Sequence, residues 1–91
     1  MIALAILIVH IHNFAFNPAT LHVPAGTQVR FVNDDADAHT VTSVQKLFDS
    51  KGLDTNDSWT YTFSRPGRYA YFCALHPYMK GTIVVDKAGR R

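Results

Sequence analysis

The sequence contains a single cysteine, Cys73, in 91 residues, and this scarcity excludes several classes of site. An internal disulfide needs two cysteines. A zinc or iron–sulfur site built from cysteines alone needs about four. Attachment of a c-type haem needs a second cysteine just before the histidine that follows Cys73. Any chemistry at Cys73 therefore involves other residue types.

The chain also lacks a strong excess of charge of either sign. Nine Lys and Arg residues stand against seven acidic ones, and the formal net charge is +2. No segment has the clustered Lys and Arg side chains that neutralise phosphates. The composition is that of an ordinary soluble protein, and we expect no nucleic acid as its partner.

No hydrophobic run is long enough for a transmembrane helix. The longest, Met1–Val9, is far shorter than the roughly 20 residues that a spanning helix needs. It has no basic residues before it, as a signal peptide would. It continues into the alternating pattern of His10, Ile11 and His12, so we interpret it as a first strand and expect no integral membrane segment.

No segment has the 3.6-residue period of an amphipathic helix, whereas runs rich in Val, Ile, Thr, Tyr and Phe alternate with turn residues. This pattern predicts an all-β chain. The least regular segment, Val44–Asn56, is the one candidate for a short helical turn. Strands are expected over Ala5–Asn13, Thr20–Val23, Thr27–Asn33, His39–Ser43, Ser58–Phe63, Gly67–Phe72 and Gly81–Asp86.

The strand over Gly67–Phe72 shows the alternation expected when one face is buried. Tyr69, Tyr71 and Cys73 share one parity, so Cys73 should point inward at the end of this strand. About seven antiparallel strands in so short a chain pack most economically as two sheets face to face. We therefore expect one β-sandwich domain covering residues 1–91.

The loop after this strand contains three side chains suited to a soft or borderline metal ion. Cys73, His76 and Met79 each lie three residues apart, between two predicted strands, and Pro77 stiffens the turn. A fourth ligand must come from elsewhere, and the obvious source is His39. Two histidines and one cysteine with a weak axial methionine form the pattern of a blue-copper site.

Two other interpretations of these residues deserve comparison. A lone cysteine is most often a small buried apolar residue, and a lone methionine is most often a core filler. A nucleophilic pair of Cys73 and His76 would need an orienting carboxylate or Asn, and the loop offers none. The combined spacing favours a metal-ligand set over both.

The motifs identify a family resemblance that runs from about Val9 to Val85. The chain resembles the cupredoxins of the plastocyanin and amicyanin group, whose fold is a Greek-key β-sandwich of two sheets. The short spacing of Cys73, His76 and Met79 is similar to that of amicyanin. The other motifs are Phe14-Ala15-Phe16-Asn17-Pro18, Val23-Pro24-Ala25-Gly26-Thr27, Asn33, His39-Thr40-Val41, Phe48-Asp49-Ser50, Tyr61-Thr62-Phe63, Pro66-Gly67, Tyr69 and Gly81-Thr82-Ile83-Val84-Val85.

This resemblance implies one type 1 copper ion held by His39, Cys73 and His76, with Met79 as the long axial ligand. It implies an electron-transfer protein and not an enzyme, in which copper cycles between Cu(I) and Cu(II). The alternatives are a copper carrier or storage protein, and a domain derived from a larger copper oxidoreductase. The resemblance also implies a periplasmic or other extracytoplasmic location.

The resemblance further implies roles for residues around the copper. Redox partner proteins, an electron donor and an acceptor, should dock on a monomer near His76, Pro77 and Tyr78. The backbone N–H of Thr40 should donate a hydrogen bond to the Cys73 sulfur. Asn33 should tie the two ligand loops together.

Three further histidines, His10, His12 and His22, fall on predicted strands. His10 and His12 share one face of their strand, and His22 could lie across from them on a neighbouring strand. The simplest interpretation is that all three are solvent-facing strand residues. The alternative is a second, adventitious site for a divalent metal ion.

Overall fold

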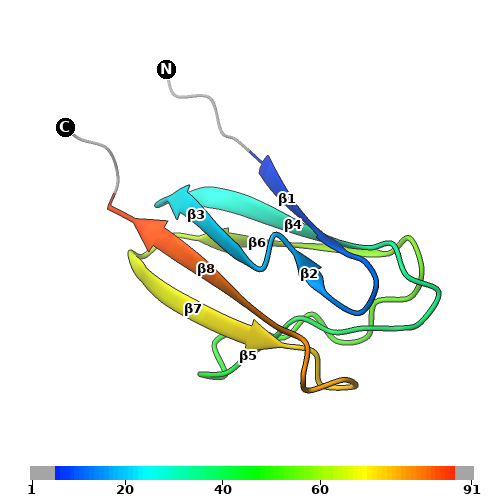
Figure 1. Ribbon diagram of the computed structural model, residues 1–91. Helices are drawn as coiled ribbons and strands as arrows, with labels where there is room; N and C mark the ends of the chain where they lie inside the picture. The colour runs from blue at the N-terminus through cyan, green and yellow to red at the C-terminus, as the bar shows by residue number, and fades with distance from the viewer. Residues whose placement is uncertain (1–5, 88–91) are drawn as a thin grey trace.

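The computed structural model describes residues 6–87, and these fold into eight strands in two layers (Figure 1). The described residues contain no helix, so the helical turn considered between Val44 and Asn56 is wrong. The strands are β1 (Ile6–Ile11), β2 (Phe16–Asn17), β3 (Thr20–Pro24), β4 (Thr27–Asn33), β5 (Thr42–Ser43), β6 (Ser58–Phe63), β7 (Gly67–Phe72) and β8 (Lys80–Asp86). The all-β sandwich predicted from the sequence is confirmed, and the two-residue strand β2 was not predicted.

Each layer is a four-stranded sheet, with the order β2-β1-β4-β6 in one and β3-β8-β7-β5 in the other. Two neighbouring pairs, β1 with β4 and β3 with β8, run parallel. The expectation that the strands are all antiparallel is therefore wrong for these two pairs. The chain passes from one sheet to the other between β2 and β3 and returns at β4, so strands far apart in sequence become neighbours. The alternation of apolar residues indicates which face is buried, but it does not indicate which strands pair.

The core is formed by the inward-facing residues of both sheets, and aromatic rings dominate its centre. Tyr71 of β7 lies edge-on to Phe16 and Phe31, with ring centroids 4.7 and 5.3 Å apart. Cys73 follows directly after β7 and is fully buried, as the strand parity predicted. The sandwich thus holds the sulfur at a fixed position at one end of the core.

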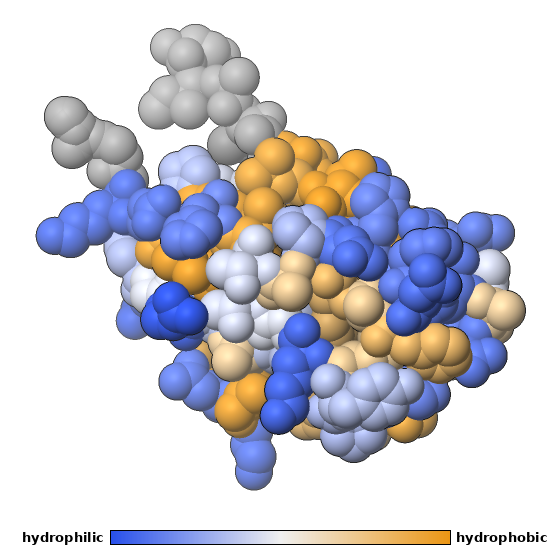
Figure 2. All heavy atoms as spheres, viewed as in Figure 1, coloured by the Kyte–Doolittle hydropathy of each residue, from blue (hydrophilic) through white to orange (hydrophobic). Residues whose placement is uncertain are grey.

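The outward face of β1 is apolar as well. Ile6 and Ile8 are 45 and 44% exposed, and Figure 2 shows apolar side chains gathered on the surface over this strand. Apolar residues on both faces of β1 explain why Ile6–Val9 show no alternation. Among the described residues, no helix is long and apolar enough to cross a membrane.

The hydroxyl of Tyr71 is an exception to the usual pairing of buried polar groups. In the described part of the chain, its Oη is the one buried side-chain polar atom without a hydrogen-bond partner. Burial also raises the pKa of Tyr71 above its ordinary value. The ring packs over Gly81, where an added Cβ would lie 2.5 Å from Oη. The Tyr71 ring thus lies directly against the backbone at Gly81.

We expect the substitution Tyr71→Phe to leave the free energy of unfolding unchanged or to raise it by up to about 1 kcal/mol, because it removes an unpaired buried hydroxyl. Urea denaturation of the metal-free protein measures this. The matched control is Tyr69→Phe, which removes a hydrogen bond from Tyr69 Oη to the carbonyl of Arg65 and should lose about 1 kcal/mol. A loss at Tyr71 as large as that at Tyr69 would contradict the prediction.

Candidate metal centre

The loops that contain the predicted ligands lie together at one end of the sandwich. Figure 1 shows the β1–β2 turn, the segment after β4 and the β7–β8 loop at the end opposite the start of β1 and the end of β8. His39 comes from the segment after β4, and Cys73, His76 and Met79 come from the β7–β8 loop. The fold therefore brings together residues that are 34 positions apart in the sequence.

His39 is held by the backbone on both sides. Its N–H donates to the carbonyl of Leu53 (3.0 Å), and its own carbonyl accepts from the N–H of Leu53 (2.7 Å). The pair forms an isolated bridge outside the strands, so the predicted strand over His39–Ser43 is reduced to β5. The His39 side chain is fully buried. Its imidazole ring is therefore surrounded by protein atoms and does not contact solvent.

The β7–β8 loop is closed by three backbone hydrogen bonds among its ligand candidates. The N–H of Cys73 donates to Met79 O (3.1 Å), that of His76 to Cys73 O (3.1 Å), and that of Met79 to His76 O (2.9 Å). Cys73 and Met79 are buried, whereas His76 is only half-buried. The short spacing predicted from the sequence therefore forms a compact turn with one edge toward solvent.

Three of the four predicted ligands converge on one point. Candidate ligand atoms of His39, Cys73 and His76 all lie within 4.8 Å of one another. The Cys73 Sγ lies 3.7 Å from Nδ1 of His39 and 3.7 Å from Nδ1 of His76. Met79 lies buried at the end of the same turn.

This donor set fits a soft or borderline transition-metal ion. Metal–nitrogen and metal–sulfur bonds of about 2.0–2.3 Å place two ligand atoms of one ion roughly 3.5 Å apart, close to the separations found here. One thiolate and two imidazoles suit copper or zinc, and a neighbouring thioether favours copper. No carboxylate belongs to the group, which makes calcium or magnesium a poor match.

The surroundings of the sulfur agree with one expectation and correct another. The N–H of Thr40 points at Cys73 Sγ at 3.4 Å, as expected. The tie between the two ligand loops, however, comes from the Thr40 hydroxyl, which accepts from the N–H of Ala74 at 2.8 Å. Asn33 makes no such contact, because its side-chain amide group donates to other backbone carbonyls. It donates to the carbonyls of Asp37 and Leu53, both at 2.9 Å.

Asp35 is the polar neighbour of the site that the sequence analysis missed. Its Oδ2 lies 2.9 Å from Nε2 of His39, and its side chain is 10% exposed. Burial alone would raise the pKa of Asp35, but hydrogen bonds from the N–H groups of Phe14 and Asn13 and from His39 outweigh it and lower the pKa. Asp35 and His39 lie four residues apart in the sequence, but in a loop this spacing does not predict a contact between the two side chains.

The other histidines do not form a second cluster. His10 Nδ1 pairs with Asp34 Oδ2 at 2.7 Å on the exposed face of β1. His22 lies on β3, in the opposite sheet, and pairs with Val84. The suggested position of His22 across from His10 and His12 is therefore wrong. Within residues 6–87, the group of His39, Cys73 and His76 is the one set of its kind close enough to hold a metal ion.

Comparison with known proteins gives consistent matches along most of the chain. Residues 5–85 match the family model of the cupredoxin-like domain. Amicyanin-alpha of Methylorubrum extorquens is 32% identical over 83 residues, covering 86% of this chain and 70% of that protein. Amicyanin of Paracoccus denitrificans is 29% identical over 85 residues, covering 88% of this chain and 65% of that protein.

Solved structures show the same relationship. The Cu(I) form of an amicyanin variant superimposes with a TM-score of 0.86 at 28% identity, covering 93% of this chain and 86% of that one. A copper-containing nitrite reductase from Thermus scotoductus superimposes with a TM-score of 0.83 at 32% identity, covering 88% of this chain but 22% of that one. The fold thus occurs both as a small separate protein and as part of a much longer chain.

Proposed function

The chain belongs to the cupredoxin-like family, and we propose that it is a small electron carrier with one type 1 copper ion bound by His39, Cys73, His76 and Met79. The observation that supports this most directly is the convergence of one sulfur and two imidazole groups within 4.8 Å. The similarity to amicyanins, including a Cu(I) form, supports copper over zinc.

Copper, when bound, supplies a one-electron couple between Cu(I) and Cu(II). The contribution of the chain is to keep its ligands in place during that change, since a small rearrangement favours fast electron transfer. His39 and Cys73 are fully buried. The two ligand loops are joined by the Thr40 N–H, which donates to Cys73 Sγ, and by the Thr40 hydroxyl, which accepts from the N–H of Ala74. The hydrogen bond from the Thr40 N–H to the sulfur also adjusts how strongly the sulfur donates electrons.

Electrons are proposed to enter and leave through His76, the most exposed of the three converging side chains. The residues beside it form an apolar surface, with Leu75 56% and Tyr78 69% exposed. We define Leu75, Pro77 and Tyr78 as the docking patch. An apolar patch around a half-buried histidine lets a redox partner approach the site closely without desolvating charges.

We expect Leu75→Lys to slow electron self-exchange by about tenfold or more, because two docking patches that meet would each bring a positive charge to the contact. Line broadening in NMR spectra of mixed reduced and oxidised protein measures this rate. The control is Leu47→Lys, which adds the same charge at a residue 53% exposed outside the patch. Equal slowing in both variants would contradict a specific role of the docking patch.

The proposed function is tested by adding Cu(II) to the metal-free protein and recording visible absorption and EPR spectra. An intense blue thiolate-to-copper band with narrow copper hyperfine splitting is the expected result. A pale spectrum, typical of nitrogen and oxygen ligation, would refute the type 1 site.

The match to part of a nitrite reductase raises a second candidate function, that of a domain derived from a larger copper oxidoreductase. We propose the electron carrier because the described residues hold one candidate metal cluster and not two. An assay with nitrite and a chemical reductant separates the candidates. Nitrite consumption by the copper-loaded protein would favour the enzyme.

We further propose that the protein works as a monomer in the periplasm or another extracytoplasmic compartment. Its similarity to amicyanins supports this location. Cell fractionation of the source organism, followed by detection of the protein, tests the location. Analytical ultracentrifugation tests the monomeric state.

A further inference from the structure

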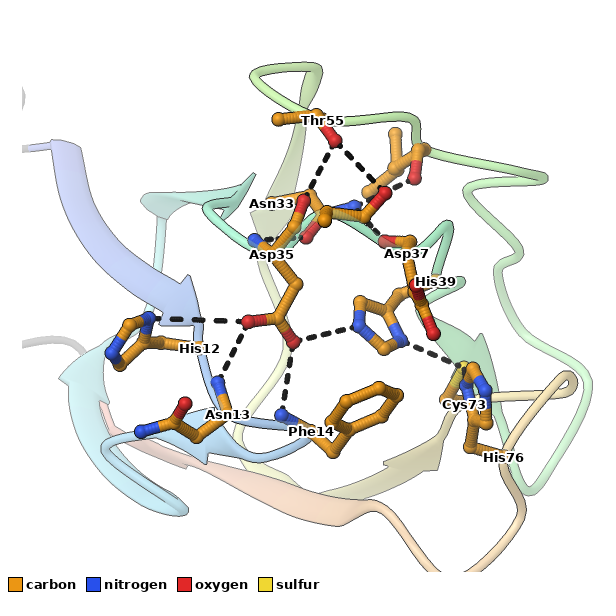
Figure 3. Close-up of polar contacts among 12 residues, drawn as sticks. His12, Asn13, Phe14, Asn33, Asp35, Asp37, His39, Thr55, Cys73 and His76 are labelled. Atoms are coloured by element: carbon orange, nitrogen blue, oxygen red, sulfur yellow. Dashed lines mark hydrogen bonds and ion pairs between the residues drawn. The ribbon is translucent and has the colours of Figure 1, made fainter.

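The carboxylate of Asp35 lies where three parts of the site meet (Figure 3). Its Oδ2 accepts a hydrogen bond from the N–H of Phe14 (2.9 Å) and lies 2.9 Å from Nε2 of His39, and its Oδ1 accepts from the N–H of Asn13 (2.7 Å). The side chain is only 10% exposed. One carboxylate thus joins the β1–β2 turn, the loop after β4 and a candidate metal ligand.

The contact with His39 determines which ring nitrogen carries the proton. Both oxygens of the Asp35 carboxylate accept hydrogen bonds from backbone N–H groups, so we assign Nε2 of His39 as the donor in its contact with Oδ2. In a neutral imidazole with its proton on Nε2, the lone pair is on Nδ1, and this atom faces Cys73 Sγ at 3.7 Å. Ligand histidines are commonly oriented in this way by a carboxylate on the second nitrogen.

The contacts with Asn13 and Phe14 stabilise an unusual turn. His12 and Ala15 exchange two backbone hydrogen bonds, of 2.9 and 3.2 Å, around the two central residues. Both central residues have positive φ angles, 54° for Asn13 and 56° for Phe14. Asn tolerates this conformation, but it is uncommon for a bulky residue such as Phe. Surrounding contacts must compensate for it, and Asp35 accepts from both N–H groups.

The turn places the Phe14 ring against both imidazoles. Its centroid lies 5.3 Å from that of His39 and 5.1 Å from that of His76, with interplanar angles of 89° and 85°. Edge-to-face contacts of this kind fix ring orientation as well as burying area. Phe14 therefore limits rotation of the two histidines from the side of the β1–β2 turn.

We propose that Asp35 is a positioning residue for the metal centre: it holds His39 with Nδ1 toward Cys73 and fixes the β1–β2 turn so that the Phe14 ring restrains both His39 and His76. This inference rests on the proposed function for its relevance to copper, but the arrangement itself is a property of the metal-free chain. It can therefore be tested with and without the metal.

The first test uses NMR on the metal-free protein. The wild type should show His39 protonated at Nε2, nuclear Overhauser contacts from the Phe14 ring to both imidazoles, and slow amide exchange at Asn13 and Phe14. Asp35→Ala should lose all three signals, and Asp35→Asn, which keeps one acceptor oxygen, should give intermediate values. The control Asp34→Ala removes the neighbouring carboxylate, which binds only the exposed His10, and should change none of them.

The second test measures Cu(II) affinity by competition with a chelator. Loss of a carboxylate that orients a metal-bound histidine typically costs about 10- to 100-fold. We expect such a loss for Asp35→Ala, an intermediate loss for Asp35→Asn, and less than about threefold for Asp34→Ala, since its charge is exposed and screened.

The outcomes separate the two proposals. Unchanged His39 protonation and Phe14 contacts in both Asp35 variants would overturn the positioning role, even if the wild type is blue. If the wild type shows no blue band, the proposed function fails, and the metal-free spectra still decide the role of Asp35. If only Asn13 and Phe14 respond in the variants, Asp35 stabilises the turn without orienting His39, and the proposal is wrong.

Discussion

Replacing Cys73 with Ser should abolish the intense blue band of the copper-loaded protein. That band requires a thiolate bound to Cu(II), and a Ser hydroxyl keeps its proton near neutral pH and is a hard donor. The Sγ position is fully buried and lies 3.7 Å from both imidazoles. No other cysteine in the chain can take its place. Absorption and EPR spectra of wild type and variant, loaded with equal amounts of Cu(II), measure the effect.

The fold of the Cys73→Ser variant should survive, because the Thr40 N–H that points at Sγ can donate to the Ser oxygen instead. Far-ultraviolet circular dichroism of the metal-free variant checks this. Ala74→Ser is the matched control, since it adds a hydroxyl at an exposed position next to the sulfur and should leave the band in place. Retained blue colour in Cys73→Ser would refute the assignment of this ligand.

Much of the fold could be predicted because β-strands leave a local pattern in the sequence. The period-2 alternation in β7 gave the inward direction of Cys73, and runs of strand-forming residues between turns gave the bounds of β6 and β7. The structure confirms both. Strand β2 was missed because it has only two residues, too few to show a period. The parallel pairing of β1 with β4 was missed because it depends on the path between sheets and not on local residues.

The metal centre shows the same difference between what a local sequence pattern predicts and what depends on contacts between distant segments. Cys73, His76 and Met79 lie in one short turn, so their spacing alone indicated a ligand set. The contact of Asp35 with His39 and with the β1–β2 turn depends on how separate loops fold against each other. His39 was proposed because the ligand pattern needed one more donor, and the resemblance to a family supported that choice. The resemblance placed Asn33 wrongly, because the loop after β4 folds back onto the Asn33 side chain.

The hydrogen bonds that the Asn33 side chain makes predict that its removal strongly lowers the free energy of unfolding. Its side chain is fully buried and makes three hydrogen bonds: it donates to Asp37 O and Leu53 O and accepts from the N–H of Asp35, all at 2.9 Å. Asn33→Ala leaves these backbone groups without that partner, at roughly 1–3 kcal/mol for each group that finds no replacement. We expect a total loss of about 3–5 kcal/mol.

A loss of that size is a large part of the total stability of so small a domain, which is about 5–14 kcal/mol. It should lower the Tm of the metal-free protein by roughly 12–40 °C, since each kcal/mol shifts a domain of this size by about 4–8 °C. Thermal and urea denaturation measure it, with the exposed Gln45→Ala as a control that should stay within about 0.5 kcal/mol of wild type. A loss below about 1 kcal/mol would show that water replaces the amide. Because Leu53 O also accepts from the N–H of His39, loosening this carbonyl should displace His39 and weaken copper binding along with the fold.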